Sequence, residues 1–473
     1  MGDEIDRRHF GAVDFSRFRR LLKQETDHLQ NLLDSDRMSE RGDIVGFELE
    51  ACIVGEDGHP RAANKKLLKA LKNPLVVPEL SQFNVELNGS PTALTGNVFS
   101  RLHDELMSTW EDCQSTANAL NCHLVQIGIL PTIEQRLLTS EHMSDMVRFE
   151  ALNDRLMAIR DGTEIEIRIE GADEELDIRH DDVMLEAAAT SFQIHLQCKP
   201  ERAIRDFNAA IVASAPMVAL SANSHYLFGK ELWSETRIPL FEQAIDIGAR
   251  HLNRVYFGSD YVNESLMEVF AANLHDHAIL LPFVQAEPLH KFAHLRFQNG
   301  TIWRWNRPLI GFDYDGQPHL RIEHRTVPSG PTIKDCVANC AAFVGFVRAL
   351  VNRATPVEEE IPFEIAKQNF YAAATHGLAA EITWTNGKTV KITDLVIEEL
   401  LPAAHDALVA AHVPKEECDL FLGIINERVR SGLNGANWQK QWVARNGRDF
   451  PRLTIDYTRL QETNEPVHTW PTP

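Results

Sequence analysis

The chain has 473 residues, of which 44% are hydrophobic and 24% are charged, values close to the averages of globular proteins. This composition excludes a disordered chain, a collagen and a coiled-coil rod. With 47 Lys and Arg residues against 68 Asp and Glu residues, the formal net charge is −21, which argues against nucleic acid as a partner because phosphate backbones are also anionic.

The hydrophobic patterns of the first 180 residues predict helices and strands in turn. In chain order they indicate an amphipathic helix at 15–35, a strand at 44–54, a long helix at 96–120 with Asn97 as its cap, a strand at 122–130, a helix at 141–160, and a hairpin of 163–170 with 173–179. The hairpin segment alternates strictly and is acidic.

The remaining patterns complete a mixed set of elements. They predict helices at 181–190 and 200–218 around a strand at 191–197, two or three strands within 294–328, helices from 332 onward, a hairpin at 382–392 with Asn386 and Gly387 at its turn, and a tail at 452–473. Strands and helices are interspersed without the regular order of βαβ units. This arrangement predicts the α+β class with a mainly antiparallel sheet.

We expect neither a targeting segment nor a membrane partner. The N-terminal segment carries acids and lacks the apolar run of a secretory signal, and no stretch approaches 18 uncharged apolar residues. Seven cysteines are scattered along the chain without a CxxC motif. Reduced thiols in the core of a cytoplasmic protein are the favoured interpretation.

Four of the predicted strands share an unusual polar face. Because side chains alternate along a strand, the apolar residues lie on one face and the polar residues on the other. The polar residues are Glu48 and Glu50 in 44–54, Asn84, Glu86 and Asn88 in 83–88, Ser191, Gln193, His195 and Gln197 in 191–197, and Arg321, Glu323 and Arg325 in 320–325. For any single strand an ordinary solvated face is favoured. Together, however, the four faces contain no lysine and little threonine, which solvated faces usually show.

If the four strands are neighbours, their carboxylates and the histidine converge. Like charges that close together cannot stay ionised without cations. Mg²⁺ and Mn²⁺ take oxygen ligands, and Mn²⁺ also accepts an imidazole. Arg325, beside Glu323 on the same face, would then clamp a phosphate or a carboxylate. The pattern therefore predicts a divalent-metal site next to an anion site.

No other motif suggests a different site. Glycine-rich phosphate loops of the types GxxxxGK[ST] and GxGxxG are absent from the sequence, so a bound ATP would be held through metals and arginines. Trp303 and Trp305 could stack on adenine, although packing at a sheet edge is the commoner role of such tryptophans. His225, His294 and His324 are expected to be structural or solvated.

A series of short motifs runs through the chain. In order they are Gly-Phe-Glu-Leu-Glu at 46–50, Asn-Val-Glu-Leu-Asn at 84–88, Gln193-Ile-His195, Ala222-Asn223-Ser224 followed by Arg237, Thr301-Ile302-Trp303 with Arg307, Glu323-His-Arg325, His376-Gly377-Leu378, and Gly435-Ala436 with Gln439. This series resembles the glutamate–cysteine ligase family, in its bacterial carboxylate–amine ligase branch. The resemblance runs from about residue 42 to about residue 446.

The resemblance implies a fold and an activity. The fold is glutamine-synthetase-like, with a curved, mainly antiparallel sheet that forms a funnel backed by helices. The activity is ATP- and Mg²⁺-dependent ligation of a carboxylate to an amine through an acyl phosphate, with Mn²⁺ as an alternative metal. The implied substrates are glutamate, through its side-chain carboxylate, and cysteine or a related amine. Small-molecule partners are therefore expected, and a homo-oligomer is compatible with them.

The resemblance also assigns metal ligands by position. Glu48, His195 and Glu323 would hold the metal nearest the γ-phosphate. Glu50 and Glu86 would hold another. All five lie on the polar faces described above, so the resemblance and the alternation of the strands point to the same side chains.

Arginines and amides are assigned in the same way. Arg325 would stabilise the transferring phosphoryl group, and Arg237 would engage a phosphate or the substrate carboxylate. Further contacts to nucleotide or substrate are expected from Arg307, Asn223, Gln193 and Asn88. Transfer of a phosphoryl group between anions needs such cations to neutralise the repulsion and to hold the groups in line.

Three positions depart from the family's pattern and bear on the substrate. Pro328 stands where an acid is expected, His225-Tyr226 where Pro and an aromatic residue are expected, and Thr375-His376 where an arginine is expected. Two alternatives therefore stay open. One is a phosphotransferase of the same fold that acts on a small amine or guanidino compound, and the other is a catalytically silent homologue with a regulatory or binding role.

The predicted organisation has one main body. We expect an N-terminal helical segment at 1–40, a catalytic antiparallel-sheet domain with helices at 41–355, a helical C-terminal part of the same domain at 356–450, and a tail at 451–473.

Overall fold

The computed structural model describes residues 4–248 and 251–471. Within these ranges the strands are β1 (Ile44–Gly55), β2 (Val76–Pro78), β3 (Asn84–Asn88), β4 (Thr92–Ala93), β5 (Cys122–Val125), β6 (Ile165–Glu170), β7 (Glu175–His180), β8 (Phe192–Cys198), β9 (Tyr226–Leu227), β10 (Lys230–Glu231), β11 (Val255–Tyr256), β12 (Trp303–Arg304), β13 (Asn306–Phe312), β14 (Pro318–His324), β15 (Glu381–Thr383) and β16 (Thr389–Lys391).

The α-helices of the same ranges occur along the whole chain and predominate after residue 332. They are α1 (Ala12–Asp34), α2 (Asn64–Leu71), α3 (Val98–Asn118), α4 (Val147–Ile159), α5 (Ala203–Ser221), α6 (Arg237–Ala244), α7 (Met267–His275), α8 (Ala293–Asn299), α9 (Ile333–Val351), α10 (Val357–Glu360), α11 (Phe363–His376), α12 (Ile392–Leu395), α13 (Leu401–Ala410), α14 (Lys415–Ser431), α15 (Gly435–Asn446) and α16 (Phe450–Gln461).

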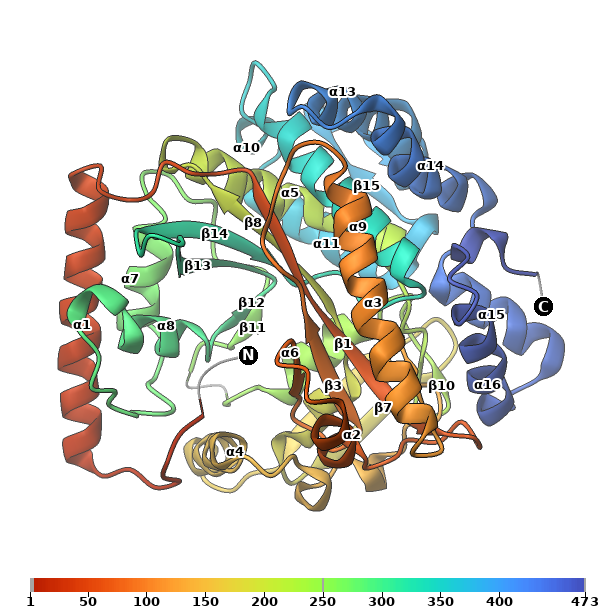
Figure 1. Ribbon diagram of the computed structural model, residues 1–473, viewed down its shortest axis with the longest axis horizontal. Helices are drawn as coiled ribbons and strands as arrows, with labels where there is room; N and C mark the ends of the chain where they lie inside the picture. Colours follow the sequence, from red (N-terminus) through yellow and green to blue (C-terminus); the bar gives the residue numbers. More distant parts are fainter. Residues whose placement is uncertain (1–3, 249–250, 472–473) are drawn as a thin grey trace.

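A curved antiparallel sheet forms the centre of the molecule (Figure 1). Its strands follow the order β13-β14-β8-β1-β3-β2, and the short strands β4 and β5 also pair with β1. All of these pairings are antiparallel. The order brings together segments that lie far apart in the sequence. The predicted α+β class and mainly antiparallel sheet are therefore confirmed.

The apolar face of this sheet is covered by helices. Val45 and Leu49 of β1 and Ile194 and Leu196 of β8 are fully buried, as their alternation predicts. Helices α5 and α9 pack against each other, and both contact strands of the sheet. On the other side of the molecule, α1 packs on α7 and α8, and α8 contacts β13 (Figure 1). The polar face of the sheet is turned toward the space between these groups of helices.

Several predicted elements are present with shifted bounds. The helices predicted at 15–35, 96–120 and 200–218 correspond to α1, α3 and α5, and Asn97 is the residue that precedes α3. The acidic hairpin consists of β6 and β7, and the hairpin around Asn386 consists of β15 and β16. These elements are therefore confirmed. They could be predicted because the period of their hydrophobic residues is visible in the local sequence, without knowledge of tertiary contacts.

The strand predicted at 122–130 is wrong beyond Val125, where β5 ends. The following backbone leaves β1 and is paired with loops instead: Gly128 N–H donates to the Asn223 carbonyl (3.1 Å), and Gly128 accepts from Thr190 N–H (2.9 Å). A side chain at Gly128 would not fit, since an added Cβ would lie 2.9 Å from Pro328 Cβ. The segment is buried and apolar, but it is not a strand.

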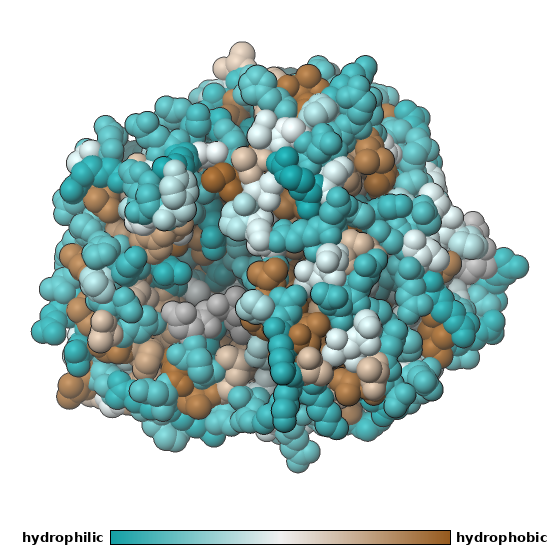
Figure 2. Space-filling view, in the orientation of Figure 1, coloured by the Kyte–Doolittle hydropathy of each residue, from teal (hydrophilic) through white to brown (hydrophobic). Residues whose placement is uncertain are grey.

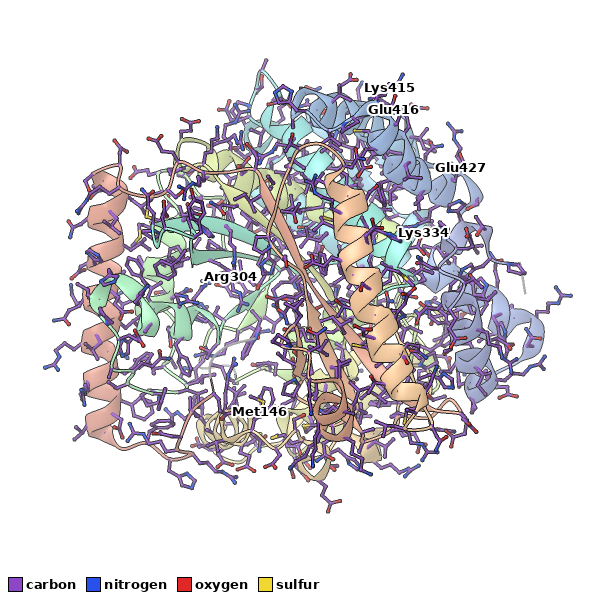
Figure 3. The ribbon with its side chains drawn as sticks, viewed as in Figure 1. Met146, Arg304, Lys334, Lys415, Glu416 and Glu427 are labelled. Atoms are coloured by element: carbon purple, nitrogen blue, oxygen red, sulfur yellow. The ribbon has the colours of Figure 1, made fainter. Side chains whose placement is uncertain are left out.

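Two predicted helices are shorter than expected. The helix predicted at 141–160 begins only at Val147, directly after Met146 (Figure 3), as α4. The helix predicted at 181–190 is a 3-10 helix, η3 (Val183–Ala188), which Asp182 caps by accepting a hydrogen bond from Met184 N–H (2.9 Å). The predicted strand region 294–328 begins with helix α8, and its strands start at β12.

The tail predicted at 452–473 is wrong for its first ten residues, which belong to α16. The buried side of α16 consists of Leu453, Thr454, Tyr457, Thr458 and Gln461. Most of these residues are polar, so the hydrophobic pattern does not show them. Two of them bind buried backbone outside the helix: Tyr457 donates to the Gln126 carbonyl (2.9 Å), and Gln461 accepts from Gln126 N–H (3.1 Å) and donates to the same carbonyl (2.9 Å). The buried hydrophobic residues form one cluster that extends from Ile5 to Trp470.

One helical segment of the described ranges, Pro200–Ser221, has the length and hydropathy of a membrane span. It contains α5, and 89% of its most apolar window is buried inside the protein. Its apolar composition is explained by its packing against α9 and α11. The segment is thus a core helix of this fold.

Candidate active site

Polar residues of five strands, namely the four predicted ones and β13, meet on one side of the sheet. Partners across an antiparallel pair lie on the same face. The cross-strand pairs are Glu50–Glu86 between β1 and β3, Glu48–Gln193 between β1 and β8, Glu323–His195 between β14 and β8, and Arg307–Glu323 between β13 and β14. The predicted adjacency of these strands is therefore present.

Glu48, His195 and Glu323 form a first cluster, in which one ligand atom of each lies within 4.8 Å of the others. His195 Nε2 is 3.5 Å from Glu48 Oε1 and 3.7 Å from Glu323 Oε1. This nitrogen is buried and has no hydrogen-bond partner among the described residues. Burial lowers the pKa of His195 to about 4, so near pH 7 the ring is neutral and can offer a lone pair to a cation.

Glu50, Glu79 and Glu86 form a second cluster with the same spacing. Glu50 accepts hydrogen bonds from Ser191 N–H (2.6 Å) and Gln193 Nε2 (2.9 Å). Burial, and then the negative charge of Glu86, raises the pKa of Glu50 to about 7. Burial also raises the pKa values of Glu79 and Glu86. Without a cation, this group of carboxylates favours its protonated forms.

Arginines balance the first cluster. Arg307 donates to both oxygens of Glu323, through Nε (2.7 Å) and Nη2 (3.0 Å), and Arg325 Nη1 lies 3.3 Å from the same carboxylate. Burial alone would raise the pKa of Glu323, but the two guanidinium groups outweigh it and hold that pKa below its usual range. Arg321, two residues before Glu323 on β14, has a buried Nε without a hydrogen-bond partner in the described part of the chain.

Gln193 connects the two clusters. Its Nε2 donates to Glu50 Oε1, and its Oε1 accepts from Arg325 Nη1 (2.5 Å). Arg325 in turn contacts Glu323. The amide is thereby fixed in one orientation, with its donor toward the acid-rich cluster and its acceptor toward the cation. The sequence placed Gln193 near the site, and its observed role is to hold Glu50 and Arg325.

The carboxylates of both clusters, though not His195, line one cavity of about 240 Å³. Figure 2 shows the molecule hollowed near its centre, with hydrophilic residues around the hollow. The charged lining consists of Glu48, Glu50, Glu79, Glu86, Glu186 and Glu323, with Arg148, Arg296, Arg307, Arg321 and Arg325. Apolar walls are provided by residues that include Leu80, Phe149, Leu152, Val183, Ile245 and Phe270. Acids and arginines thus face the same enclosed space.

Three predicted site residues lie elsewhere. Arg237 is buried and donates to Glu235 (3.1 Å) and to the Arg325 carbonyl (3.2 Å), so its guanidinium supports the chain after β14 instead of facing the cavity. Asn223 donates to the Ser329 carbonyl (2.8 Å). Asn88 donates to Glu86 Oε1 (3.0 Å) from the edge of the second cluster. None of the three lines the described cavity, and direct substrate contact by them is not supported.

Besides Arg321, four charged lining residues were not assigned from the sequence: Glu79, Glu186, Arg296 and Arg148. Glu79 follows β2, Glu186 lies on η3, and the two arginines lie on helices. These residues lie outside the strands in which polar and apolar residues alternate. The tertiary fold, which the sequence pattern does not show, brings them to the cavity. Arg321 differs, since it belongs to the polar face of the 320–325 strand, and the alternation alone could have included it.

Of the two tryptophans considered for stacking on adenine, Trp305 belongs to the core and Trp303 reaches the cavity. Trp305 is buried, donates to Glu242 (2.8 Å) and lies under the Arg237 guanidinium (5.3 Å), which excludes an exposed stacking surface. Trp303 lines the cavity, while its neighbour Arg304 (Figure 3) packs over Tyr256 (5.1 Å).

The three histidines set aside as structural are buried as well. His225, His294 and His324 each have a hydrogen-bond partner within the protein.

Two solved structures share this fold over most of the chain. The glutamate–cysteine ligase from Francisella tularensis in complex with AMP matches with a TM-score of 0.54 at 11% identity, covering 92% of this chain and 91% of that one. A bifunctional glutathione synthetase from Pasteurella multocida matches with a TM-score of 0.51 at 10% identity, covering 93% of this chain and 54% of that one. The present chain thus spans about half of the second protein.

These matches confirm the predicted glutamine-synthetase-like fold class. A search of curated proteins finds no match. Residues 44–450, by contrast, match the sequence profile described as glutamate-cysteine ligase family 2 (GCS2). The matched region contains every strand of the central sheet and both acidic clusters. The chain therefore belongs to glutamate-cysteine ligase family 2.

Proposed function

We propose that this protein is an ATP-dependent carboxylate–amine ligase that joins the side-chain carboxylate of glutamate to cysteine or a related amine. The observation that carries the proposal is the pair of three-membered, metal-capable clusters whose carboxylates line one cavity, together with Arg307, Arg321 and Arg325. Membership of the family supports the ligase chemistry. The two proteins of similar fold are a glutamate–cysteine ligase and a glutathione synthetase, which agrees with the proposal, as does the AMP bound to the first.

The donor sets fit divalent cations. The unpartnered, neutral imidazole of His195 and the carboxylates of Glu48 and Glu323 suit a metal that accepts oxygen and nitrogen ligands. Glu50, Glu79 and Glu86 offer oxygen alone, as Mg²⁺ prefers. Such metals would supply positive charge to a triphosphate. The raised pKa values of the second cluster support a need for cations there.

The proposed reaction has two steps. The donor carboxylate attacks the γ-phosphorus of ATP, and the bond from that phosphorus to the bridging oxygen breaks to release ADP. The amine nitrogen then attacks the acyl carbon, the bond from that carbon to the phosphate oxygen breaks, and inorganic phosphate leaves. A primary amine that arrives as an ammonium ion loses two of its three N–H protons, one before the attack and one after it, and the amide keeps the third. Both steps bring negatively charged or electron-rich groups together. The protein must therefore hold these groups in line and supply positive charge next to them.

Arg325 is the residue best placed to meet the negative charge of the transferring group. Its guanidinium is held by Gln193 and Glu323, and is therefore oriented before any ligand arrives. Arg307 is bound to Glu323 at two points and fixes that carboxylate. Arg321, with its unpartnered Nε, is the remaining cation on this face of β14 and is a candidate for a phosphate contact.

The proposal is tested by measuring ADP release from the purified protein with Mg-ATP, L-glutamate and a panel of amines, together with mass spectrometry of the products. We expect ADP and a new amide in equal amounts. A phosphorylated amine without an amide would favour the phosphotransferase of the same fold. Absence of Mg-ATP binding in calorimetry would favour the catalytically silent homologue.

A further inference from the structure

The cavity extends beyond the two acidic clusters toward α4 and η3. These elements contribute Phe149, Leu152, Val183 and Glu186 to its wall. They are fastened to each other, because Asn153 of α4 accepts a hydrogen bond from Val183 N–H (3.1 Å). This part of the wall is apolar apart from Glu186 and Arg148. It is not part of either metal-ligand cluster.

The Glu186 carboxylate lacks the hydrogen bonds and arginine contacts that hold Glu323 and Glu50, and it also lacks a neighbour such as the His195 ring, which lies 3.5 Å from Glu48. Glu323 binds Arg307, and Glu50 accepts from Ser191 and Gln193. No hydrogen bond or ion pair reaches the Glu186 carboxylate from the described part of the chain, where only longer-range charges act on it. A half-buried carboxylate that is left unpaired in a protein is costly. A cationic ligand would remove this cost.

The electrostatic surroundings support a cation at this point. Burial, followed by the negative charge of Glu50, raises the pKa of Glu186 to about 8, although Arg325 and Arg148 act in the opposite direction. A substrate that brings a positive charge would be drawn to the carboxylate. The divalent cations of the proposed reaction are assigned to the two clusters, which do not include Glu186. Of the remaining groups in that reaction, the ammonium groups of the amino-acid substrates carry such a charge.

We propose that Glu186 binds the ammonium group of the acceptor amine. This inference rests on the proposed function and names the acceptor site of the same cavity. Glu186 lies within electrostatic range of Arg325 and Glu50, where the transferring phosphoryl group is placed. The acceptor nitrogen must reach the acyl carbon beside that group. In glutamate, three carbons separate the side-chain carboxyl carbon from the α-amino nitrogen, so the donor's own ammonium group lies farther away.

The apolar neighbours narrow the class of acceptor. Val183 is on the same 3-10 helix as Glu186, and Phe149 and Leu152 come from the helix fastened to it. Such a wall favours a primary amine with a short, weakly polar substituent over a second dicarboxylate. Glu186 is therefore a binding and specificity residue for the nucleophile.

The test compares charged and neutral nucleophiles in Glu186→Gln. L-cysteine, L-2-aminobutyrate and ethylamine are mostly ammonium ions at pH 7.5, whereas hydroxylamine is neutral and traps the acyl phosphate as a hydroxamate. We expect KM for the ammonium-bearing acceptors to rise about ten- to hundredfold, the range of one lost charge-assisted contact. The loss with hydroxylamine should be at least tenfold smaller, and KM for ATP and glutamate should change little.

Two further variants control the comparison. Glu175→Gln removes an exposed carboxylate on β7 and should behave as the wild type. Glu186→Asp keeps the charge and should recover part of the acceptor affinity, which a purely structural role would not explain. Thermal unfolding of each variant establishes that it is folded.

The outcomes separate this inference from the proposed function. Equal losses with charged and neutral nucleophiles, an effect confined to KM for glutamate, or no effect would overturn the acceptor site. Wild-type reaction with hydroxylamine alone, and with none of the three ammonium-bearing acceptors, would overturn it as well. If the wild type releases no ADP and forms no hydroxamate, the proposed function itself fails.

Discussion

Glu50 and Glu323 lie on the same polar face, but the charges around them have opposite signs. Glu323 is held by Arg307 and Arg325, and its pKa is lowered even though burial opposes this. Glu50 has Glu86 opposite it across β1 and β3, and burial together with that carboxylate raises its pKa. Arginines of the protein thus stabilise Glu323 as an anion, whereas the hydrogen bonds that Glu50 accepts from Ser191 and Gln193 do not offset its burial and the charge of Glu86. A bound cation would stabilise the Glu50 anion.

This contrast predicts opposite changes in stability for two substitutions that should both abolish ADP release. In metal-free protein at pH 8, Glu50→Gln should stabilise the fold by about 1–3 kcal/mol, because it removes a buried, repelled charge. Glu323→Gln should destabilise it by about 1–3 kcal/mol, because Arg307 and Arg325 lose their anionic partner. Urea unfolding in EDTA measures both values. Changes of the same sign would contradict this electrostatic account, and retained ADP release in both variants would contradict the metal assignment.

At the scale of elements, the sequence predicts what is local and misses what depends on packing. The alternation in four strands is visible in the sequence, and it correctly groups Glu48, Glu50, Glu86, His195 and Glu323 on one face. Their adjacency, however, depends on the strand order, which alternation does not contain. The ordered motifs of the family resemblance provided it.

For a related reason, some residues on helices and turns were not assigned to the site, and one that was assigned lies outside the cavity lining. Glu79 and Glu186 follow no period that links them to the strands, and Arg237 follows a family motif although its guanidinium binds backbone carbonyls. Helix α16 was missed because its buried side is polar, with Tyr457 and Gln461 in hydrogen bonds. Hydrophobic periodicity cannot detect a helix that is anchored in this way.

The anchoring of α16 can be tested at Tyr457. Its hydroxyl donates to the Gln126 carbonyl (2.9 Å) and accepts from Asn223 Nδ2 (2.9 Å). Tyr457→Phe leaves both groups without this partner inside the core, so we expect a loss of about 1–2 kcal/mol in the free energy of unfolding. Arg459→Ala, on the exposed side of the same helix, should change it by less than about 0.5 kcal/mol. Urea denaturation distinguishes the two, and equal effects would contradict a docked helix.

At the scale of the whole molecule, folding gathers acids from separate parts of an already acidic chain. The net charge is −21, and the cavity draws glutamates from β1, β3, β14, η3 and the residue after β2. The fold therefore stores unfavourable electrostatic energy at its centre, which binding of divalent cations would release. Stability and cation binding should then be linked through pH.

The direction in which stability changes with pH follows from the groups whose pKa values are shifted. Glu50 and Glu186 have pKa values raised to about 7 and about 8, so the folded state keeps protons that the unfolded state has lost above pH 4.5. Their contribution to stability is complete at low pH and is lost as pH rises to 8. His195, with its pKa lowered to about 4, acts in the opposite direction, but its contribution is complete above pH 6.5. Buried Glu242, raised to about 7, adds to the loss.

We therefore expect the metal-free protein to lose about 1–3 kcal/mol of stability between pH 6.5 and pH 8. Mg²⁺ binds the ionised carboxylates, so it should raise the melting temperature at both pH values and more strongly at pH 8. Differential scanning calorimetry in EDTA and in 10 mM Mg²⁺ measures both effects. In the double variant Glu50→Gln/Glu186→Gln the pH dependence should shrink. Two results would contradict a cation site among these carboxylates. One is a melting temperature at pH 8 that does not change when Mg²⁺ is added, and the other is a melting temperature in EDTA that rises from pH 6.5 to pH 8.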